Sequence, residues 1–305
     1  VEKIGRREIR YKIPEKELKT LSEKPHIALI GAGGTIASRI EYGTGAVKPA
    51  FSIHELSQAI PEIFSIANII PIELFNIFSE DMRPDYWIEM AIKVASEINS
   101  GADGIVITHG TDTMQYSASA LAFMLQNLAV PIVFTGAQRS SDRPASDAAM
   151  NVIHSTVFAA KGKIAESVVC MHASLDDTRS FIHRGVRVRK MHSSRRDAFR
   201  TIGDTPLAQV QNMEIKYIKR NGFIARGSYD KSETYADAKF CKKTALIYVY
   251  PYMDPEILET LIDKKYRGII IAGTGLGHVP ENLLNTIRRG VHENVIIAMT
   301  TQCIW

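Results

Sequence analysis

Short apolar runs alternate with stretches of helical periodicity along most of the chain. In residues 85–99 the apolar positions recur every three or four residues, and Pro84 stands near the start of this stretch, which favours a helix. The same periodicity predicts helices over 117–128 and 145–160. Strands buried on both faces read as continuous apolar runs, and such runs occur at 26–30, 104–107, 132–135 and 167–172. This alternation is typical of βαβ units, so we expect an α/β fold with a parallel sheet.

The pattern changes between residues 205 and 243. Residues 213–219, Asn221-Gly222 and 223–225 predict a β-hairpin with a two-residue turn, and a polar stretch follows over 227–243. We therefore place a hairpin and linker at 211–243, between an N-terminal α/β domain (25–210) and a smaller C-terminal α/β domain (244–305). In the second domain the predicted strands and helices are, in chain order, 245–249, 255–261, 268–272, 281–289 and 295–299.

Both ends of the sequence suggest a fragment. The first residue is Val1 rather than Met, and the chain stops at Trp305, directly after the apolar run 295–299. We expect sequence to be missing at both ends, so that the C-terminal domain is truncated here.

The composition is that of an ordinary globular protein, with 45% hydrophobic and 23% charged residues among 305. The formal net charge of +4 is too small to indicate nucleic-acid binding by itself. Cys170, Cys241 and Cys303 lie far apart, which argues against a disulfide framework or a thiolate metal site and fits a reducing interior. No apolar run approaches 18 residues and the first 24 residues are charged, so we expect no membrane span, no secretory signal and a cytoplasmic location.

Two threonine motifs carry the candidate chemistry. Gly33-Gly34-Thr35-Ile36 and Thr108-His109-Gly110-Thr111-Asp112-Thr113 each follow a predicted buried strand. Ligands of an open parallel sheet bind at the carboxyl ends of its strands. Amide hydrolysis needs an activated nucleophile, a base and donors for the developing oxyanion. The two motifs therefore resemble two halves of one hydrolytic site.

Other interpretations explain these motifs less well. A dinucleotide fingerprint would need a third glycine where Ile36 stands, and no Gly-Lys-Ser/Thr follows to make a P-loop. A plain strand-to-helix turn is an alternative for the first motif, and helix capping accounts for one residue of the second but not for its density of polar groups. The nine histidines form no zinc-type pattern, so no metal is expected, and His109 is interpreted as structural.

At this point the chain resembles the bacterial-type L-asparaginases and glutaminases. The resemblance runs from about residue 26 to the end and includes both threonine motifs, extended to Ala37 and Met114, together with Ser79-Glu80-Asp81-Met82, Gly136-Ala137-Gln138-Arg139 and Ser146-Asp147. It implies an asparaginase-like fold, in which a catalytic parallel-sheet N-terminal domain precedes a smaller α/β domain.

Finer features resemble one branch of that family, the D subunits of archaeal glutamyl-tRNA(Gln) amidotransferases. They are Thr44-Gly45-Ala46-Val47, the segment 186–199 and Thr300-Thr301-Gln302-Cys303-Ile304-Trp305. Members of this branch carry an extra small β domain before the hydrolase core, so residues 1–24 would be the connector to it.

The resemblance also implies roles for individual residues. Thr35 matches the nucleophile of the first loop and Tyr42 matches the tyrosine paired with it on a mobile flap. Thr111, Asp112 and Lys190 match the second threonine, its carboxylate and the lysine that contacts it. The positions that hold the substrate are expected at Ser79, Glu80, Gly110, Asp112 and Ala137. Either threonine could attack first, and Lys190 could act as a base or as a positioning charge.

The expected function is hydrolysis of glutamine through a threonine acyl-enzyme, with ammonia passed to an E-type partner subunit that amidates Glu-tRNA(Gln). The hydrolase subunit would need no cofactor, ATP and Mg²⁺ belonging to the partner, and it would form a homodimer core and meet tRNA through the partner. A free-standing L-asparaginase is the alternative, although Leu276 stands where many such enzymes carry an asparagine. A non-catalytic scaffold that kept the fold is a third possibility.

A basic run surrounds Lys190, with six arginines between positions 184 and 200. Such a run is often a solvated face, and it could also form a modest patch for RNA phosphates. Phe181 and Phe199 only bracket the run, so base stacking is not supported.

Overall fold

The computed structural model describes residues 24–34, 36, 38–40, 47–49, 52–141 and 145–304. An eight-stranded sheet forms the centre of the N-terminal unit, in the order β13-β12-β9-β8-β7-β5-β1-β4. β1, β4, β5, β7 and β8 run parallel to one another, whereas β9, β12 and β13 are joined by antiparallel pairings. The strands are β1 (His26–Gly33), β4 (Asn68–Ile77), β5 (Gly104–Thr108), β7 (Ile132–Thr135), β8 (Ser167–His172), β9 (Arg179–Arg184), β12 (Ala208–Gln211) and β13 (Glu214–Tyr217). The predicted α/β fold with a mainly parallel sheet is confirmed.

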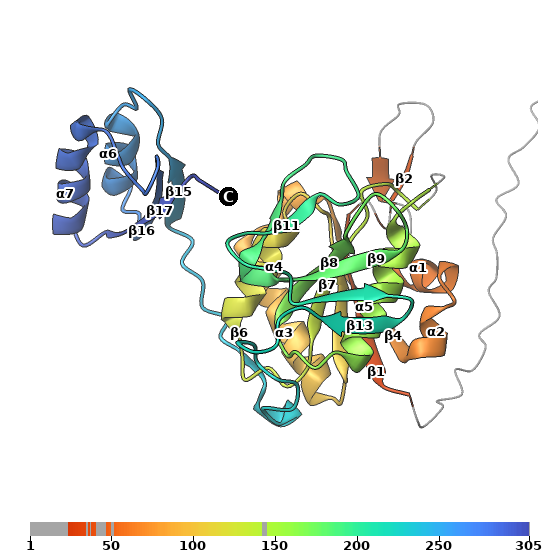
Figure 1. Cartoon of the computed structure of the whole chain (residues 1–305). Coiled ribbons are helices and arrows are strands. Elements are labelled where there is room, and N and C mark those ends of the chain that lie inside the picture. The colour runs from red at the N-terminus through yellow and green to blue at the C-terminus, as the bar shows by residue number, and fades with distance from the viewer. Residues whose placement is uncertain are drawn as a thin grey trace, which may run out of the picture.

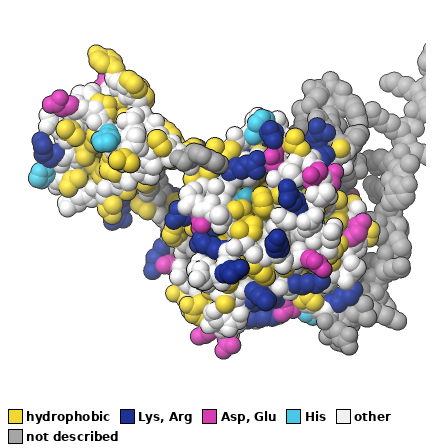
Figure 2. All heavy atoms as spheres, in the orientation of Figure 1, with side chains coloured by type: hydrophobic (Ala, Val, Ile, Leu, Met, Phe, Trp, Pro, Cys, Tyr) yellow, Lys and Arg dark blue, Asp and Glu magenta, His cyan; other side chains and the backbone are white. Residues whose placement is uncertain are grey.

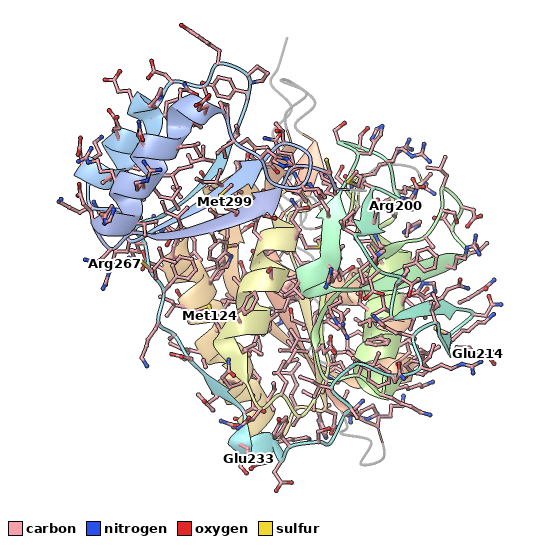
Figure 3. The ribbon with its side chains drawn as sticks, turned by 60° about the vertical axis from the view of Figure 1, so that its left-hand side comes forward. Met124, Arg200, Glu214, Glu233, Arg267 and Met299 are labelled. Atoms are coloured by element: carbon pink, nitrogen blue, oxygen red, sulfur yellow. The ribbon has the colours of Figure 1, made fainter. Side chains whose placement is uncertain are left out.

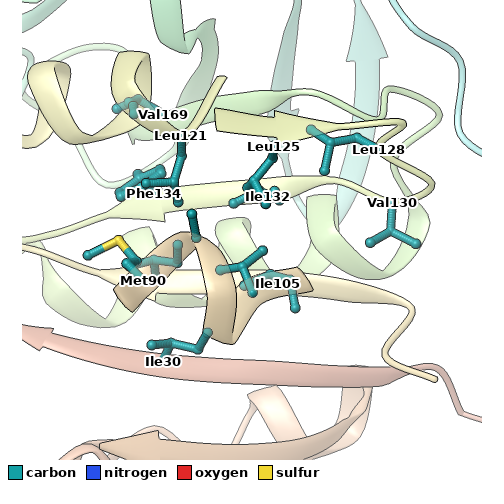
Figure 4. Close-up of a cluster of buried hydrophobic side chains, with 14 of the residues drawn as sticks. Ile30, Met90, Ile105, Leu121, Leu125, Leu128, Val130, Ile132, Phe134 and Val169 are labelled. Carbon is teal, nitrogen blue, oxygen red and sulfur yellow. The ribbon is translucent and has the colours of Figure 1, made fainter. Parts of the chain in front are cut away.

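Helices cover both faces of this sheet (Figure 1). Side chains alternate across a strand, so Ala28 and Ile30 of β1 pack into one core and Ile27 and Leu29 into the other. The first core also contains residues of α3 (Pro84–Asn99) and α4 (Met114–Met124), and Figure 4 shows part of it around Phe134. The second core contains residues of α1 (Ile53–Ala59), α2 (Ile63–Ile66) and α5 (Ala148–Lys161).

The predicted hairpin over 213–225 is wrong. The hairpin in the structure joins β12 to β13, and its turn residues Asn212 and Met213 both have positive φ, at 50° and 64°, as a two-residue turn between twisted strands requires. Ala208 and Val210 are fully buried against the second core, which fixes the register of β12 against β9. Asn221-Gly222 lies instead in the loop that follows β13.

A return crossing brings the chain after β9 back along α4. The 3₁₀ turn η3 (Gly185–Arg187) leads into β10 (Val188–Lys190), which pairs with β11 (Phe199–Thr201). Gly185 passes close to both β8 and α4, because a Cβ there would lie 2.7 Å from the carbonyl oxygen of Ser167 and 3.0 Å from that of Ala118 in α4. Figure 3 shows this ribbon, labelled at Arg200, beside the helix that ends at Met124.

The remaining short elements lie around the main layers. β2 pairs with β3, and β14 pairs with β6 directly after α4. They are β2 (Ser38–Ile40), β3 (Val47–Pro49), η2 (Ser79–Asp81), β6 (Leu125–Gln126), η4 (Lys231–Glu233) and β14 (Tyr235–Ala236).

The C-terminal unit is a three-stranded parallel sheet with its own hydrophobic core (Figure 1). It consists of β15 (Thr244–Tyr248), α6 (Glu256–Asp263), β16 (Gly268–Gly273), η5 (Glu281–Leu283), α7 (Leu284–His292) and β17 (Ile296–Thr301). The segment leading to it touches α3 through the rings of Phe240 and Trp87 and through an ion pair between Lys242 and Asp85. Among the described residues, no helix is long and apolar enough to cross a membrane.

Candidate active site

Four neighbouring strands of the sheet end at one edge and carry the candidate site. β4, β1, β5 and β7 are adjacent and parallel, and Thr108 of β5 is in register with Gly31 of β1 and with Thr135 of β7. The loops that follow these strands therefore meet. Thr113 Oγ1 donates to the carbonyl oxygen of Ser79 at 2.7 Å, which ties the loop after β5 to the turn after β4.

A lysine, a threonine and an aspartate form the centre of this edge. Lys190 Nζ donates to Thr111 Oγ1 at 2.8 Å and to Asp112 Oδ1 at 2.7 Å. The Thr111 residue is buried, and only 8% of the Lys190 side chain is exposed, whereas 69% of the Asp112 side chain is exposed. The ammonium group thus points inward at a hydroxyl and is balanced by a carboxylate at the surface.

The main chain of Lys190 is held as firmly as its side chain. Its backbone N–H donates to Gln115 Oε1, in the first turn of α4, at 2.6 Å. On the opposite strand its partner is Phe199, which is fully buried. Lys190 therefore does not belong to a solvated basic face, which was the simpler interpretation of the run of arginines.

The other predicted site residues fall into three groups. Gly110 lies against Ser79, since a Cβ on Gly110 would be 2.5 Å from Ser79 Cβ, and both residues are buried. Ala137 is buried after β7, and Glu80 is exposed in η2. Thr35 and Tyr42 lie outside the described residues, although Gly34 is described and a Cβ on it would be 2.4 Å from the backbone N of Gly110. The backbone of the first motif thus lies against the backbone of the second, at Gly34 and Gly110.

His109 packs beneath the site. Its Nδ1 lies 2.7 Å from the carbonyl oxygen of Gly110, its Nε2 lies 2.8 Å from Ser117 Oγ, and that hydroxyl accepts from Trp87 Nε1 at 2.8 Å. Because the carbonyl oxygen can only accept, Nδ1 carries the proton and Nε2 accepts from the hydroxyl. Burial lowers the pKa of His109 to about 4. His109 is thus a neutral ring that fixes the Gly110 carbonyl, which fits its interpretation as structural.

Four polar residues near the site were not predicted to have a role. Thr111 Oγ1 donates to Gln138 Oε1 at 3.4 Å, and Gln138 Nε2 is buried and has no hydrogen-bond partner among the described residues. Asp147 accepts from the backbone N–H groups of Gln138 and Arg139 at 3.0 Å and from Asn151 Nδ2 at 3.2 Å. Gln138 and Asp147 occur within motifs that indicated the family, but Asn151 and Gln115 carry no local signal.

Carboxylates neutralise much of the basic run. Arg195 and Arg200 both pair with buried Asp197, and Arg184 and Arg196 pair with other carboxylates. Hydrogen bonds from Arg195, and then from Arg200, lower the pKa of Asp197 to about 2. On the face in Figure 2, basic side chains are interspersed with acidic and hydrophobic ones. Four of the six arginines of the run are thus paired with carboxylates, which reduces the charge available to RNA phosphates.

The described part of the chain has no group of three or more His, Cys, Asp or Glu side chains that could hold a metal ion. The polar groups at the site are hydroxyl, ammonium, carboxylate and carboxamide. They can hold a zwitterionic ligand and move protons between oxygen atoms.

Comparisons with known proteins match both units. The family model "Asparaginase, N-terminal" matches residues 26–222 and "Glutaminase/Asparaginase C-terminal domain" matches residues 243–305. The D subunit of the glutamyl-tRNA(Gln) amidotransferase of Pyrococcus furiosus is 53% identical over 290 residues, which are 95% of this chain and 65% of that protein. The protein of the same name from Pyrococcus abyssi is 51% identical over 313 residues, covering 100% of this chain and 70% of that one. The chain thus spans about two thirds of the length of these relatives.

Solved structures of asparaginases share the fold. The thermostable L-asparaginase from Thermococcus kodakarensis superposes with a TM-score of 0.78 at 30% identity, covering 92% of this chain and 81% of that one. The probable cytoplasmic L-asparaginase from Campylobacter jejuni superposes with a TM-score of 0.79 at 26% identity, covering 92% and 84%.

Proposed function

Because the chain belongs to the asparaginase and glutaminase family, we propose that it hydrolyses the side-chain amide of glutamine as the D subunit of a glutamyl-tRNA(Gln) amidotransferase. About 50% identity to relatives of that name over nearly the whole chain supports this choice within the family. The observation that carries the chemistry is the contact of Lys190 Nζ with both Thr111 Oγ1 and Asp112 Oδ1.

The reaction proceeds through an ester on a threonine. The hydroxyl of Thr35 adds to the amide carbon and gives up its proton with the help of Tyr42, the C–N bond breaks and ammonia leaves with that proton. Water then hydrolyses the ester to release glutamate and restore the hydroxyl. Thr111, Asp112 and Lys190 serve this second step. The same chemistry results if Thr111 attacks the amide and Thr35 serves the hydrolysis of the ester.

Lys190 contributes charge to either step. Its ammonium already donates to Thr111 Oγ1, so negative charge that develops on that oxygen is stabilised without rearrangement. Asp112 stabilises the charged form of the lysine and fixes its direction.

The substrate is held by the polar rim of the same edge. Glutamine presents an ammonium and a carboxylate, so it needs acceptors and donors on opposite sides. Glu80 and Asp112 accept from the ammonium, Ser79 and the backbone at Gly110 donate to the carboxylate, and Ala137 faces the carboxamide. This pattern would accept asparagine as well, which has the same polar groups on a shorter side chain.

Ammonia would pass to an E-type partner subunit in the cytoplasm. That protein would bind ATP, Mg²⁺ and Glu-tRNA(Gln) and form the amide on the tRNA-bound glutamate. The D subunits would associate as a homodimer core.

Ammonia release tests the proposal. The full-length protein, purified with its partner, is assayed on glutamine with and without Glu-tRNA(Gln) and ATP. We expect Thr35→Ala and Thr111→Val to abolish release, while Thr260→Val, on the exposed side of α6, retains it. Wild-type turnover in both site variants would contradict the site assignment.

The second candidate function is that of a free-standing L-asparaginase, because the solved structures named above are of proteins with that name. Leu276 is 95% exposed and offers no side-chain hydrogen bond, in contrast to an asparagine at that position. Rapid asparagine hydrolysis by the isolated full-length protein, without any response to Glu-tRNA(Gln), would favour this function.

A further inference from the structure

A continuous chain of hydrogen bonds runs from the loop after β7 to the segment that follows Lys190. It passes through three side chains that are fully buried, Asp147 and Asn151 at the start of α5 and His172 at the end of β8. It then continues through Asp177 to Arg196. None of these five residues contacts Thr111 or Lys190 in the bonds described above.

The orientation of Asn151 is fixed by its neighbours. Its Nδ2 donates to the carbonyl oxygen of Gly136 at 2.9 Å and to Asp147 Oδ2 at 3.2 Å, and both of these atoms can only accept. Its Oδ1 therefore faces His172 Nδ1 at 2.7 Å, as an acceptor. Consequently Nδ1 of His172 must carry a proton.

The second nitrogen of the same ring also faces an acceptor. His172 Nε2 lies 3.0 Å from Asp177 Oδ1, and this oxygen accepts from Arg196 Nη1 at 3.0 Å. A carboxylate oxygen that accepts from a guanidinium has no proton to offer, so Nε2 must donate. Each ring nitrogen of His172 thus faces an acceptor, an arrangement that a doubly protonated ring satisfies.

Charges of opposite sign alternate along this series of hydrogen-bonded side chains. In the part of the chain that the structure describes, the ionisable groups linked to His172 are Asp147 at the N-cap of α5, through Asn151, His154 within α5, and Asp177 and Arg196 in loops. Burial, and then repulsion by the charge of His172, lower the pKa of His154 to about 4, so this neighbour stays neutral near pH 7. Arg196 also donates to the carbonyl oxygens of Leu175 and Ala145, which anchors it to the loop before α5.

We propose that His172 is a positioning residue that acts as a buried imidazolium. Through Asn151 it holds the Gly136 carbonyl, and through Asp177 and Arg196 it holds the segment that begins at Lys190. A single charged ring thereby fixes two parts of the site that approach from opposite sides. The inference rests on the proposed function only in that Ala137, next to Gly136, and Lys190 serve the reaction.

The protonation state is measured without reference to activity. Nitrogen-15 NMR of the full-length protein labelled at histidine, with His172→Gln to assign the signal, should give imidazolium shifts for both ring nitrogens at pH 7. Shifts of a neutral ring for His172 would overturn the proposal even if glutamine hydrolysis were established.

Two adjacent carboxylates allow a matched test of positioning. Asp177→Asn removes the charged acceptor, whereas Asp176→Asn alters the neighbouring carboxylate, which bonds only to Ser174 and Thr178 among the described residues. Asp177 is at the surface, so both variants should fold. We expect Asp177→Asn to lower kcat/KM for glutamine by about three- to tenfold, the size of a moderate coupling between sites, and to weaken the imidazolium signal.

The pH profile separates positioning from general stabilisation. In the wild type, kcat/KM should be highest wherever the NMR shifts show both ring nitrogens of His172 protonated, and Asp177→Asn should alter this profile whereas Asp176→Asn should not. Equal profiles for Asp177→Asn, Asp176→Asn and the wild type would refute the link. If the wild-type protein did not hydrolyse glutamine at all, the proposed function would be contradicted. The NMR shifts alone would then show whether His172 is an imidazolium.

Discussion

The ammonium nitrogen of Lys190 and the hydroxyl oxygen of Thr111 lie 2.8 Å apart, although 79 positions separate the two residues in the chain. Thr111 comes directly from a parallel strand, but Lys190 reaches it only after the chain has turned back over α4. The contact therefore requires that the loop after β5, which holds Thr111, and β10, which holds Lys190, are both in place.

Removal of the ammonium should cost activity more than stability. Lys190→Met keeps the length of the side chain but leaves Thr111 without a charged donor. We expect ammonia release to fall by about a hundredfold to ten-thousandfold, the range for loss of a positioned acid–base or charged group. Lys216→Met, on the exposed side of β13, is the control and should keep full activity. A Lys190→Met enzyme with near-normal turnover would remove this residue from the mechanism.

A single methyl group at position 110 should separate two loops of the site. In Gly110→Ala the new Cβ would lie 2.5 Å from Ser79 Cβ and 2.7 Å from Ser79 Oγ, so the turn after β4 must shift. We expect a large loss of glutamine hydrolysis and a decrease of roughly 1–3 kcal/mol in the free energy of unfolding. Gly268→Ala is the control, since its nearest contact would be an ordinary 3.4 Å. Thermal melting and steady-state assays of both variants measure the difference.

Three buried histidines should make the protein sensitive to acid. Burial lowers the pKa of His109 and His154 to about 4 and that of His183 to about 3, below the ordinary value of 6.5. Between these values the unfolded chain binds more protons than the folded protein, so the free energy of unfolding falls as pH drops from about 6.5 towards 4. Each histidine adds up to about 1.4 kcal/mol per pH unit to this slope.

Urea unfolding at several pH values checks the slope. His183→Leu should reduce it, because the variant lacks a buried group whose pKa is lowered. Among the described residues, His183 Nε2 has no hydrogen-bond partner and Nδ1 lies 2.8 Å from Thr201 Oγ1, so an apolar side chain there gives up one polar contact. His292→Asn, at the exposed end of α7, should leave it unchanged. A slope that is the same in all three proteins would mean that His183 is not desolvated.

Asp197 should contribute strongly to the free energy of unfolding, because it pairs with two arginines of the basic run. Asp197→Asn removes the carboxylate that holds Arg195 and Arg200, two residues from Phe199, the strand partner of Lys190. We expect the free energy of unfolding to fall by roughly 1–3 kcal/mol, because two guanidinium groups lose a buried partner. Asp204→Asn, which breaks a surface pair with Lys219, should cost less than about 1 kcal/mol. Comparable losses in both variants would contradict this ranking.

The parallel core was predictable because its strands are buried on both faces. The apolar runs that became β1, β5, β7 and β8 carried a continuous signal. β4 was not predicted: it is an edge strand with Pro71 and Glu73, and of its ten residues only Ile69 is buried, the others being partly buried or exposed. Proline is tolerated in such a strand because an edge needs fewer ladder bonds. The hydrophobic pattern of β4 therefore gave only a weak strand signal, although β4 pairs with β1 in the sheet.

Local patterns could not supply the long-range contacts of the site. The Asn-Gly pair at 221–222 predicted a turn more strongly than Asn212-Met213, yet burial of Val210 selected the latter. Lys190 was singled out by resemblance alone, since the surrounding arginines suggested a solvated face. The carboxylates that pair with these arginines include Glu166 and Asp177, which lie outside the run and have no periodic relation to it.

The close approach of Gly185 to α4 makes activity dependent on a residue that touches no reacting group. A side chain there would push the returning chain away from α4. The displacement would reach Lys190 five residues later, because β10 begins directly after η3 and no loop between them can absorb the shift. A random screen for inactive but folded variants should thus recover changes at Gly185 and at the α4 residues beneath it. In this protein, the position of the lysine is determined as much by the spacing between a helix and a passing strand as by the identity of the lysine itself.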